Sequence, residues 1–259
     1  MSSSYLILLL AAVWAGAQNA LAGGGSFVTL PALMLTGLDA RAANITSTVA
    51  LFPGQVSAGY LGRKHAAGVE GMGLPTLIGV SAAGGVCGAL LLLATPPSYF
   101  GKLVPWLVLF GTAVFTWGNF IRKPGDGARK LGPRSALAVQ FLIGFYGGYY
   151  GGGNGFLMLA ALSLTGQAIR TAGATKNLVI ALINGSAVVL FLFTPGLDWM
   201  RIAIVASGAL IGGWGGVWLL RRIDERWLKL GIVAIGVTLT VWLFLRRRQR
   251  PFSVLARQN

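Results

Sequence analysis

Long apolar stretches alternate with short polar ones along all 259 residues of the chain. A run of about 18 or more apolar residues is long enough to cross the roughly 30 Å hydrocarbon core of a bilayer as a helix. The pattern therefore predicts an all-α polytopic membrane protein with about seven or eight transmembrane helices. The hydrophobic segments fall at about residues 5–38, 42–61, 72–95, 99–121, 135–166, 172–194, 200–220 and 228–245.

The composition supports a membrane protein, because only 10% of the residues are charged and 55% are hydrophobic, whereas a soluble domain carries about 25% charged residues. The 21 Lys and Arg residues outnumber the six Asp and Glu. They lie in short clusters between apolar segments, such as Arg63-Lys64 and Arg246–Arg248. This placement is typical of loops held at a membrane face, not of a nucleic-acid-binding patch. The expected partner is the lipid bilayer, and no nucleic acid is expected.

The metal and disulfide chemistry open to the chain is limited, because it contains one cysteine, Cys87, and one histidine, His65. A single cysteine excludes an intrachain disulfide framework and a multi-cysteine metal site. We expect neither a metal nor a cofactor.

The chain divides into two similar halves at its longest polar linker, which carries five basic residues. We expect a first transmembrane repeat at residues 1–121, a basic cytoplasmic linker at 122–134, and a second repeat with a basic C-terminal tail at 135–259. Shifting the sequence by 129 residues aligns the starts of the two halves without a gap. The identities include Gly23 with Gly152, Gly24 with Gly153, Thr36 with Thr165, Arg41 with Arg170 and Thr46 with Thr175.

The first apolar segment of each half is interrupted by a glycine cluster, Gly23–Ser26 in one and Gly151–Gly155 in the other. A continuous helix of about 30 residues would be about 45 Å long, too long for one crossing and too short for two. Because glycine disfavours helix, each cluster predicts a break or a turn back. If each segment crosses once, the halves share one orientation, and if each is a re-entrant hairpin, the repeats are inverted. Counting basic residues on the two faces does not separate these topologies. We favour hairpins, since transporters commonly use inverted pairs.

Paired interrupted segments in two repeats indicate a transporter's binding site. A glycine-rich turn that leads into a helix offers free N–H groups and the positive end of the helix dipole, which favour an anion. The alternative is that the glycines only allow helices to pack closely. The candidate substrate-binding residues are Gly23, Gly24, Gly25, Ser26, Asn44, Thr46, Ser47, Gly152, Gly153, Asn154, Thr175, Lys176 and Asn177.

Lys176 is notable among these residues because it lies at the start of an otherwise apolar segment. An ionisable side chain is costly there and is a functional candidate by default, and its ammonium group is suited to pair with an anion. The alternative is that it reaches out to the membrane interface from near a helix end. Asn19, Asn154 and Asn184 are further candidates for a polar lining, although interhelical hydrogen bonding explains them equally well.

Carboxylates are missing from the apolar segments, which weighs against a proton relay, a cation channel with an acidic ring and an intramembrane hydrolase. We therefore expect no enzymatic activity. All six acidic residues fall in predicted loops or at segment edges: Asp39, Glu70, Asp126, Asp198, Asp224 and Glu225.

The motifs around the two breaks resemble those of the TauE/SafE sulfite and sulfonate exporter family, also called the TSUP permeases. The resemblance rests on Ala22-Gly-Gly-Gly-Ser-Phe-Val-Thr-Leu-Pro-Ala-Leu33, Thr36-Gly37 and Ala43-Asn-Ile-Thr-Ser47, with the second-half counterparts Gly151–Gly155, Thr165-Gly166 and Ala174-Thr-Lys-Asn177. It implies a bacterial inner-membrane protein that moves sulfite, sulfonates or other small organic anions. The second half reads Thr-Lys-Asn where the first reads Thr-Ser-Thr, so the two half-sites are not equivalent.

The sequence thus predicts a multi-pass inner-membrane transporter, for export or uptake, that binds a small anion between two glycine-broken helices. The alternatives are an anion channel, a membrane-embedded enzyme, or a subunit of a membrane complex without transport of its own. The identity of the anion, the direction of transport, the coupling ion and the formation of a homo-oligomer stay open.

Overall fold

The computed structural model describes residues 3–21, 23–69, 71–121, 133–165, 167–220 and 225–249. These residues form helices joined by short turns, which confirms the all-α prediction. A 3₁₀ turn, Arg63–His65, follows α3, and a π-helical turn, Trp117–Ile121, extends α5. The helices are α1 Ser3–Leu21, α2 Ser26–Leu35, α3 Ala40–Gly62, α4 Leu74–Ala94, α5 Pro97–Thr116, α6 Pro133–Tyr149, α7 Asn154–Leu164, α8 Ile169–Phe191, α9 Trp199–Leu220 and α10 Glu225–Gln249.

The helices have the length and the surface of a membrane protein. Within the described residues, three segments are long and apolar enough to cross a bilayer: Leu74–Ala94, Pro97–Thr116 and Arg170–Phe191. Large apolar side chains also lie on the outside, among them Phe193 and Trp214, which are 84% and 80% exposed. An outer surface of this kind is suited to lipid, so the prediction of a membrane protein is confirmed.

Both predicted breaks are present. The first separates α1 from α2 at residues 23–25, and the second separates α6 from α7 at residues 150–153. Gly23 and Gly153 have φ values of 83° and 78°, in a region that residues with a Cβ atom rarely adopt. At about 1.5 Å per residue, α2 and α7 are about 15–17 Å long, too short to cross a bilayer alone.

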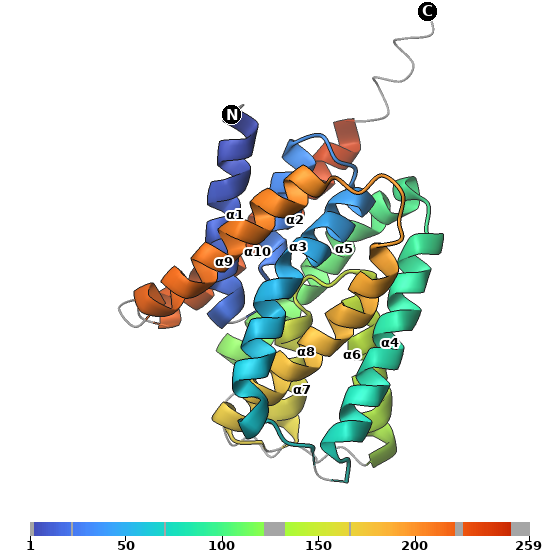
Figure 1. Ribbon diagram of the computed structural model, residues 1–259, viewed down its shortest axis with the longest axis vertical. Helices are drawn as coiled ribbons and strands as arrows, with labels where there is room; N and C mark the ends of the chain where they lie inside the picture. The colour runs from blue at the N-terminus through green and yellow to red at the C-terminus, as the bar shows by residue number, and fades with distance from the viewer. Residues whose placement is uncertain are drawn as a thin grey trace, which may run out of the picture.

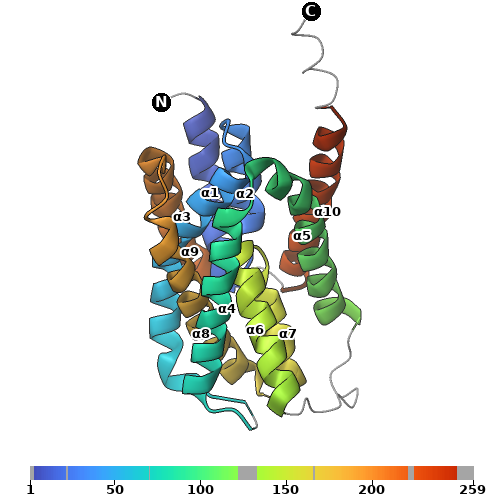
Figure 2. The ribbon, with the colours of Figure 1, turned by 90° about the vertical axis from the view of Figure 1, so that its right-hand side faces the viewer.

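Each broken segment is a hairpin. In Figures 1 and 2, α1 and α2 enter and leave at the end of the molecule that holds the N-terminus, whereas α6 and α7 enter and leave at the opposite end. The long helices α3 and α8 run in opposite directions between these ends (Figure 1). This arrangement supports the hairpin topology and the inverted orientation of the two halves.

Packing in one half is mirrored in the other. Helix α1 packs against α9 as α6 packs against α4, while α3 packs against α8 and α5 against α10. Local hydrogen bonds repeat as well, since Thr36 and Thr165 each donate a hydroxyl hydrogen bond of 2.7 Å to the carbonyl three residues earlier. This correspondence supports the division into repeats at 1–121 and 135–259, which stays a prediction. Most of the linker at 122–134 lies outside the described residues.

Glycines bring the α4 and α6 backbones into close contact. A methyl group added at Gly88 would lie 2.0 Å from the carbonyl oxygen of Phe145, and one added at Gly148 would lie 2.0 Å from that of Gly85. Neither site has room for a side chain, so the glycines set the distance between the two helices, as small residues do in membrane bundles.

We predict that Gly88→Ala destabilises the protein, because the added methyl group collides with backbone that cannot move aside. Overpacking of this kind costs about 1–3 kcal/mol. Thermal unfolding of the detergent-solubilised protein should show a Tm several degrees lower. The matched control is Gly79→Ala on the same helix, where a methyl group meets no atom within 4 Å. Equal Tm values for the two variants would contradict the proposed packing constraint.

Candidate functional site

The tips of the two hairpins meet inside the molecule. A methyl group added at Gly23 in the first break would lie 3.3 Å from the Cα atom of Gly155, at the start of α7. The rings of Phe27 and Phe156, which are 129 residues apart in the sequence, lie beside this contact with centroids 6.1 Å apart. The predicted meeting of the two glycine-rich stretches is therefore seen in the fold.

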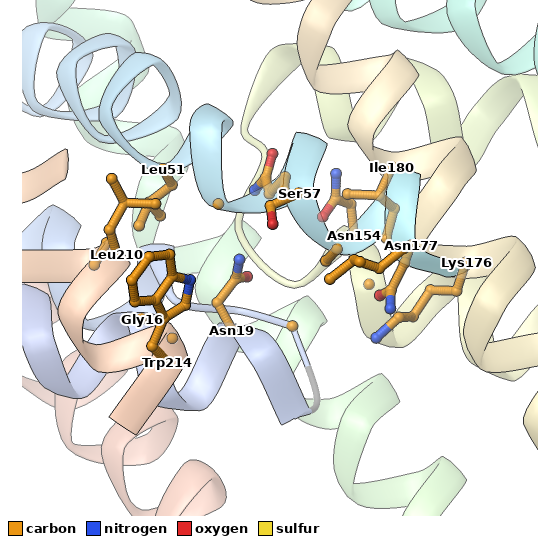
Figure 3. A pocket seen from close by; sticks show the side chains of 18 residues that line it. Gly16, Asn19, Leu51, Ser57, Asn154, Lys176, Asn177, Ile180, Leu210 and Trp214 are labelled. Atoms are coloured by element: carbon orange, nitrogen blue, oxygen red, sulfur yellow. The ribbon is translucent and has the colours of Figure 1, made fainter. Parts of the chain in front are cut away.

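A cavity of about 210 Å³ lies beside the meeting tips. Helices α1, α3, α8 and α9 and the first residues of α7 surround it. Figure 3 shows Lys176, Asn177 and Asn154 on one side of this cavity and Leu51, Leu210 and Trp214 on the other. The polar lining consists of Asn19, Gln55, Ser57, Asn154, Lys176 and Asn177.

Lys176 is the cationic group that borders the cavity in the described part of the chain. The residue is only 4% exposed, and its side chain extends from α8 toward the middle of the cavity (Figure 3). It forms no hydrogen bond or ion pair with any residue that the structure describes. Asp39 caps α3 and Asp198 pairs with Arg201, so neither of these carboxylates neutralises Lys176. A buried ammonium without a counter-charge is energetically costly and favours an anionic ligand.

A chain of three buried amides runs along the cavity wall. Asn154 Nδ2 donates to Asn184 Oδ1 at 3.3 Å, and Asn184 Nδ2 donates to Gln55 Oε1 at 2.7 Å. In this orientation the Nε2 group of Gln55, which lines the cavity, is a donor without an acceptor among the described residues. Gln55 and Asn184 lie 129 residues apart, so equivalent positions of the two halves contact each other here.

Backbone N–H groups at the start of α7 add further donors. Asn154 and Gly155 line the cavity, and their backbone N–H groups have no acceptor within the ranges described above. The first N–H groups of a helix lack intrahelical partners and carry the positive end of its dipole. On the facing side, Asn19 Oδ1 accepts a long hydrogen bond of 3.5 Å from the Gly25 N–H group, so the Asn19 amide directs its acceptor into the break.

Four of the predicted site residues line the cavity: Gly23, Asn154, Lys176 and Asn177. Two others pack beside it, since an added methyl group would meet the Phe156 ring at Gly24 and the Ala15 carbonyl at Gly25.

The other predicted residues are buried elsewhere. Thr175 Oγ1 accepts from the Ala67 N–H group at 2.9 Å and donates to the Ala67 carbonyl at 3.1 Å, which ties the α3–α4 loop to α8. Asn44 Nδ2 donates to the Tyr149 carbonyl at 3.3 Å, and the hydroxyls of Ser47 and Thr29 are 2.6 Å apart. The remaining members lie in the core outside the cavity lining: Ser26, Thr46, Gly152 and Gly153.

Several lining residues were absent from the predicted set, chiefly Gln55, Ser57, Leu210 and Trp214. Gln55 carried a usable signal, because it is a polar residue in an apolar segment and lies 129 residues before Asn184. Leu210 and Trp214 carried no such signal, because the sequence alone does not distinguish an apolar residue that lines a cavity from one that faces lipid.

The sequence is similar to those of known membrane transporter proteins. The sulfite exporter TauE/SafE family matches residues 8–243. A "probable membrane transporter protein" of Haemophilus influenzae is 31% identical over 199 residues, which are 75% of this chain and 76% of that protein. The "probable membrane transporter protein YfcA" of Escherichia coli is 26% identical over 92% of this chain and 88% of its own length. The "probable membrane transporter protein ORF9" of a Sinorhizobium species is 29% identical over 91% and 90%, respectively. No solved structure matches the chain.

We predict that Asn184→Ala lowers the free energy of unfolding. The substitution removes the amide that accepts from Asn154 Nδ2 and donates to Gln55 Oε1, so both of these buried groups lose their partner. Each buried polar group left unpaired costs about 1–3 kcal/mol. The measurement is thermal unfolding in detergent, with Ser207→Ala as the control. Ser207 is exposed on α9 and bonds only to carbonyls of its own helix. An Asn184 variant as stable as the Ser207 variant would show that the amide chain contributes nothing.

Proposed function

The chain belongs to the sulfite exporter TauE/SafE family, and we propose that it moves a small anion across the bacterial inner membrane through the cavity beside the two hairpin tips. Its family and the names of its relatives make it a membrane transporter. They support a carrier rather than an enzyme. The family description supports sulfite, an organosulfonate or a related organic acid as the anion.

The observation that carries this proposal is the buried ammonium group of Lys176, which has no hydrogen-bond or ion-pair partner among the described residues. Burying a lysine in an apolar segment costs about 2.5–3.5 kcal/mol on insertion scales. An anion in the cavity offsets that cost, because an ammonium–anion hydrogen bond is roughly twice as strong as a neutral one. In the absence of a described carboxylate near Lys176, the substrate itself is the natural counter-charge.

The remaining polar groups of the cavity complete an anion site. The backbone N–H groups of Asn154 and Gly155 stand at the positive end of the α7 dipole, and the Asn177 and Gln55 side chains add amide donors. Helix N-termini that point at an anionic substrate are a recurring feature of transporters with broken helices. We assign the binding role to these groups together with Gly23 and Lys176.

The asymmetry between the halves supports alternating access. The cavity is bordered by Ser57 and by Leu61, the latter in the last turn of α3, next to the basic α3–α4 loop. The position equivalent to Ser57 is Ser186, where the space is closed, since a methyl group added at Gly85 would lie 2.6 Å from Ser186 Oγ. In a carrier whose inverted halves exchange conformations, one of two equivalent positions is expected to face an open space while the other is closed. A channel instead needs a continuous pore.

We predict that Lys176→Gln lowers kcat/KM for anion uptake into proteoliposomes. A hydrogen bond to a charged group contributes about 1.5–3 kcal/mol, or about tenfold to 150-fold. Lys176→Arg should retain part of the activity, because it keeps the charge. Arg170→Gln is the matched control, since Arg170 lies exposed on the same helix. Unchanged uptake in the Lys176→Gln variant would remove this residue from the site.

We also predict that the two equivalent serines differ in accessibility. In a Cys87→Ser background, Ser57→Cys should react with a membrane-impermeant maleimide added on the side of the basic loops, whereas Ser186→Cys should be protected. Sulfite or ethanesulfonate at saturating concentration should slow the reaction of Ser57→Cys. Fast labelling of both cysteines from both sides would indicate an open channel and contradict the carrier.

A further inference from the structure

The cavity has a charged end and an apolar end, and we propose that it selects an organic monoanion with a short apolar tail over bare sulfite. This inference rests on the proposed transport function of the same cavity. It assigns recognition of the tail to Leu51, Leu210 and Trp214, and recognition of a singly charged sulfonate or carboxylate head to Lys176 and its neighbouring donors.

The charged end provides one full positive charge. Among the described lining residues, Lys176 is the charged one, and the other polar groups there are neutral amides, one hydroxyl and backbone N–H groups. Amides and N–H groups solvate an anion but do not neutralise a second charge in a low-dielectric site. A head group that carries one negative charge is therefore matched to this end.

The opposite end is apolar and lies at the outer edge of the helix bundle, since Leu210 and Trp214 are 37% and 80% exposed. Figure 3 shows Leu51 from α3 and Leu210 and Trp214 from α9 gathered on the side away from Lys176. Leu210 and Trp214 are one helical turn apart on α9, so their side chains lie on the same face of that helix. An indole ring and two leucine side chains offer dispersion and burial to alkyl groups, and the indole N–H is the one polar group among these three side chains.

The size of the cavity also argues for a tail. A volume of about 210 Å³ is far above the roughly 10–15 Å³ that holds a single water molecule. Sulfite is compact, with three oxygens on one sulfur. Seated at Lys176, it would leave the apolar end of the cavity without contacts to the substrate. A chain of a few methylene groups reaches that end and contacts its apolar side chains.

The test is a series of singly charged ligands that differ in tail length. Dissociation constants of purified protein in detergent are measured by calorimetry for methane-, ethane- and butanesulfonate, for the carboxylates acetate and pentanoate, and for sulfite. We expect binding to tighten about fourfold for each methylene, equivalent to about 0.8 kcal/mol. Sulfite should bind more weakly than butanesulfonate. The two head-group series show which head, sulfonate or carboxylate, the charged end prefers.

Two variants test the two ends of the cavity separately. Trp214→Ala should flatten the dependence on tail length, so that butanesulfonate loses more affinity than methanesulfonate. Trp199→Ala is the matched control, because Trp199 is an exposed tryptophan on the same helix outside the cavity lining. Lys176→Gln should weaken all the anions by a similar factor.

The outcomes distinguish a failure of tail recognition from a failure of the anion site. If the anions bind but tail length has no effect, or if Trp214→Ala and Trp199→Ala behave alike, tail recognition is wrong while the anion site stands. If no anion binds, or if Lys176→Gln changes nothing, the proposed function fails and the tail preference fails with it.

Discussion

Backbone inside a bilayer must satisfy its own hydrogen bonds, and this constraint underlies the whole structure. Non-helical backbone survives at membrane depth only where protein or a polar cavity surrounds it. The two glycine breaks meet this requirement by lying against each other, with Gly23 next to Gly155 and the Phe27 and Phe156 rings beside them. The same arrangement leaves the N–H groups of Asn154 and Gly155 next to a cavity. The contact that satisfies the fold therefore also leaves hydrogen-bond donors facing a cavity.

The two halves share one helical framework but carry different polar side chains at equivalent positions. At the position that Lys176 occupies in α8, α3 carries Ser47, whose hydroxyl is 2.6 Å from that of Thr29. Asn177 likewise corresponds to Thr48, which donates to the carbonyl of Asn44 in its own helix. At these two positions the first half pairs its polar side chains internally, whereas the second half presents a charge that the described residues do not neutralise. That difference turns an approximately symmetric scaffold into a site with one charged side.

Close packing and open space alternate around this site. The contact between α4 and α6 depends on glycines that leave no room for a methyl group, and Gly85 also brings α4 close to α8 at Ser186. On the other side, the cavity lies between α3, near Ser57, and α9. The combination of a tight contact on one side and an open space on the other is suited to a protein whose halves move against each other.

The sequence by itself determined the fold class, the glycine breaks and the presence of an ionisable residue, Lys176, in an apolar segment. Each of these follows from a local rule: the length of apolar runs, the low helix preference of consecutive glycines, and the cost of an ionisable group in an apolar segment. The tertiary structure alone decided which polar residues share a cavity. It grouped Asn154, Lys176 and Asn177 with Gln55 and placed Thr175 at a loop contact with Ala67. It also formed the apolar end from Leu51, Leu210 and Trp214. Which helix faces meet depends on contacts between residues far apart in the chain, and no local pattern of apolar residues encodes those contacts in a membrane protein, where lipid-facing and core-facing side chains are equally hydrophobic.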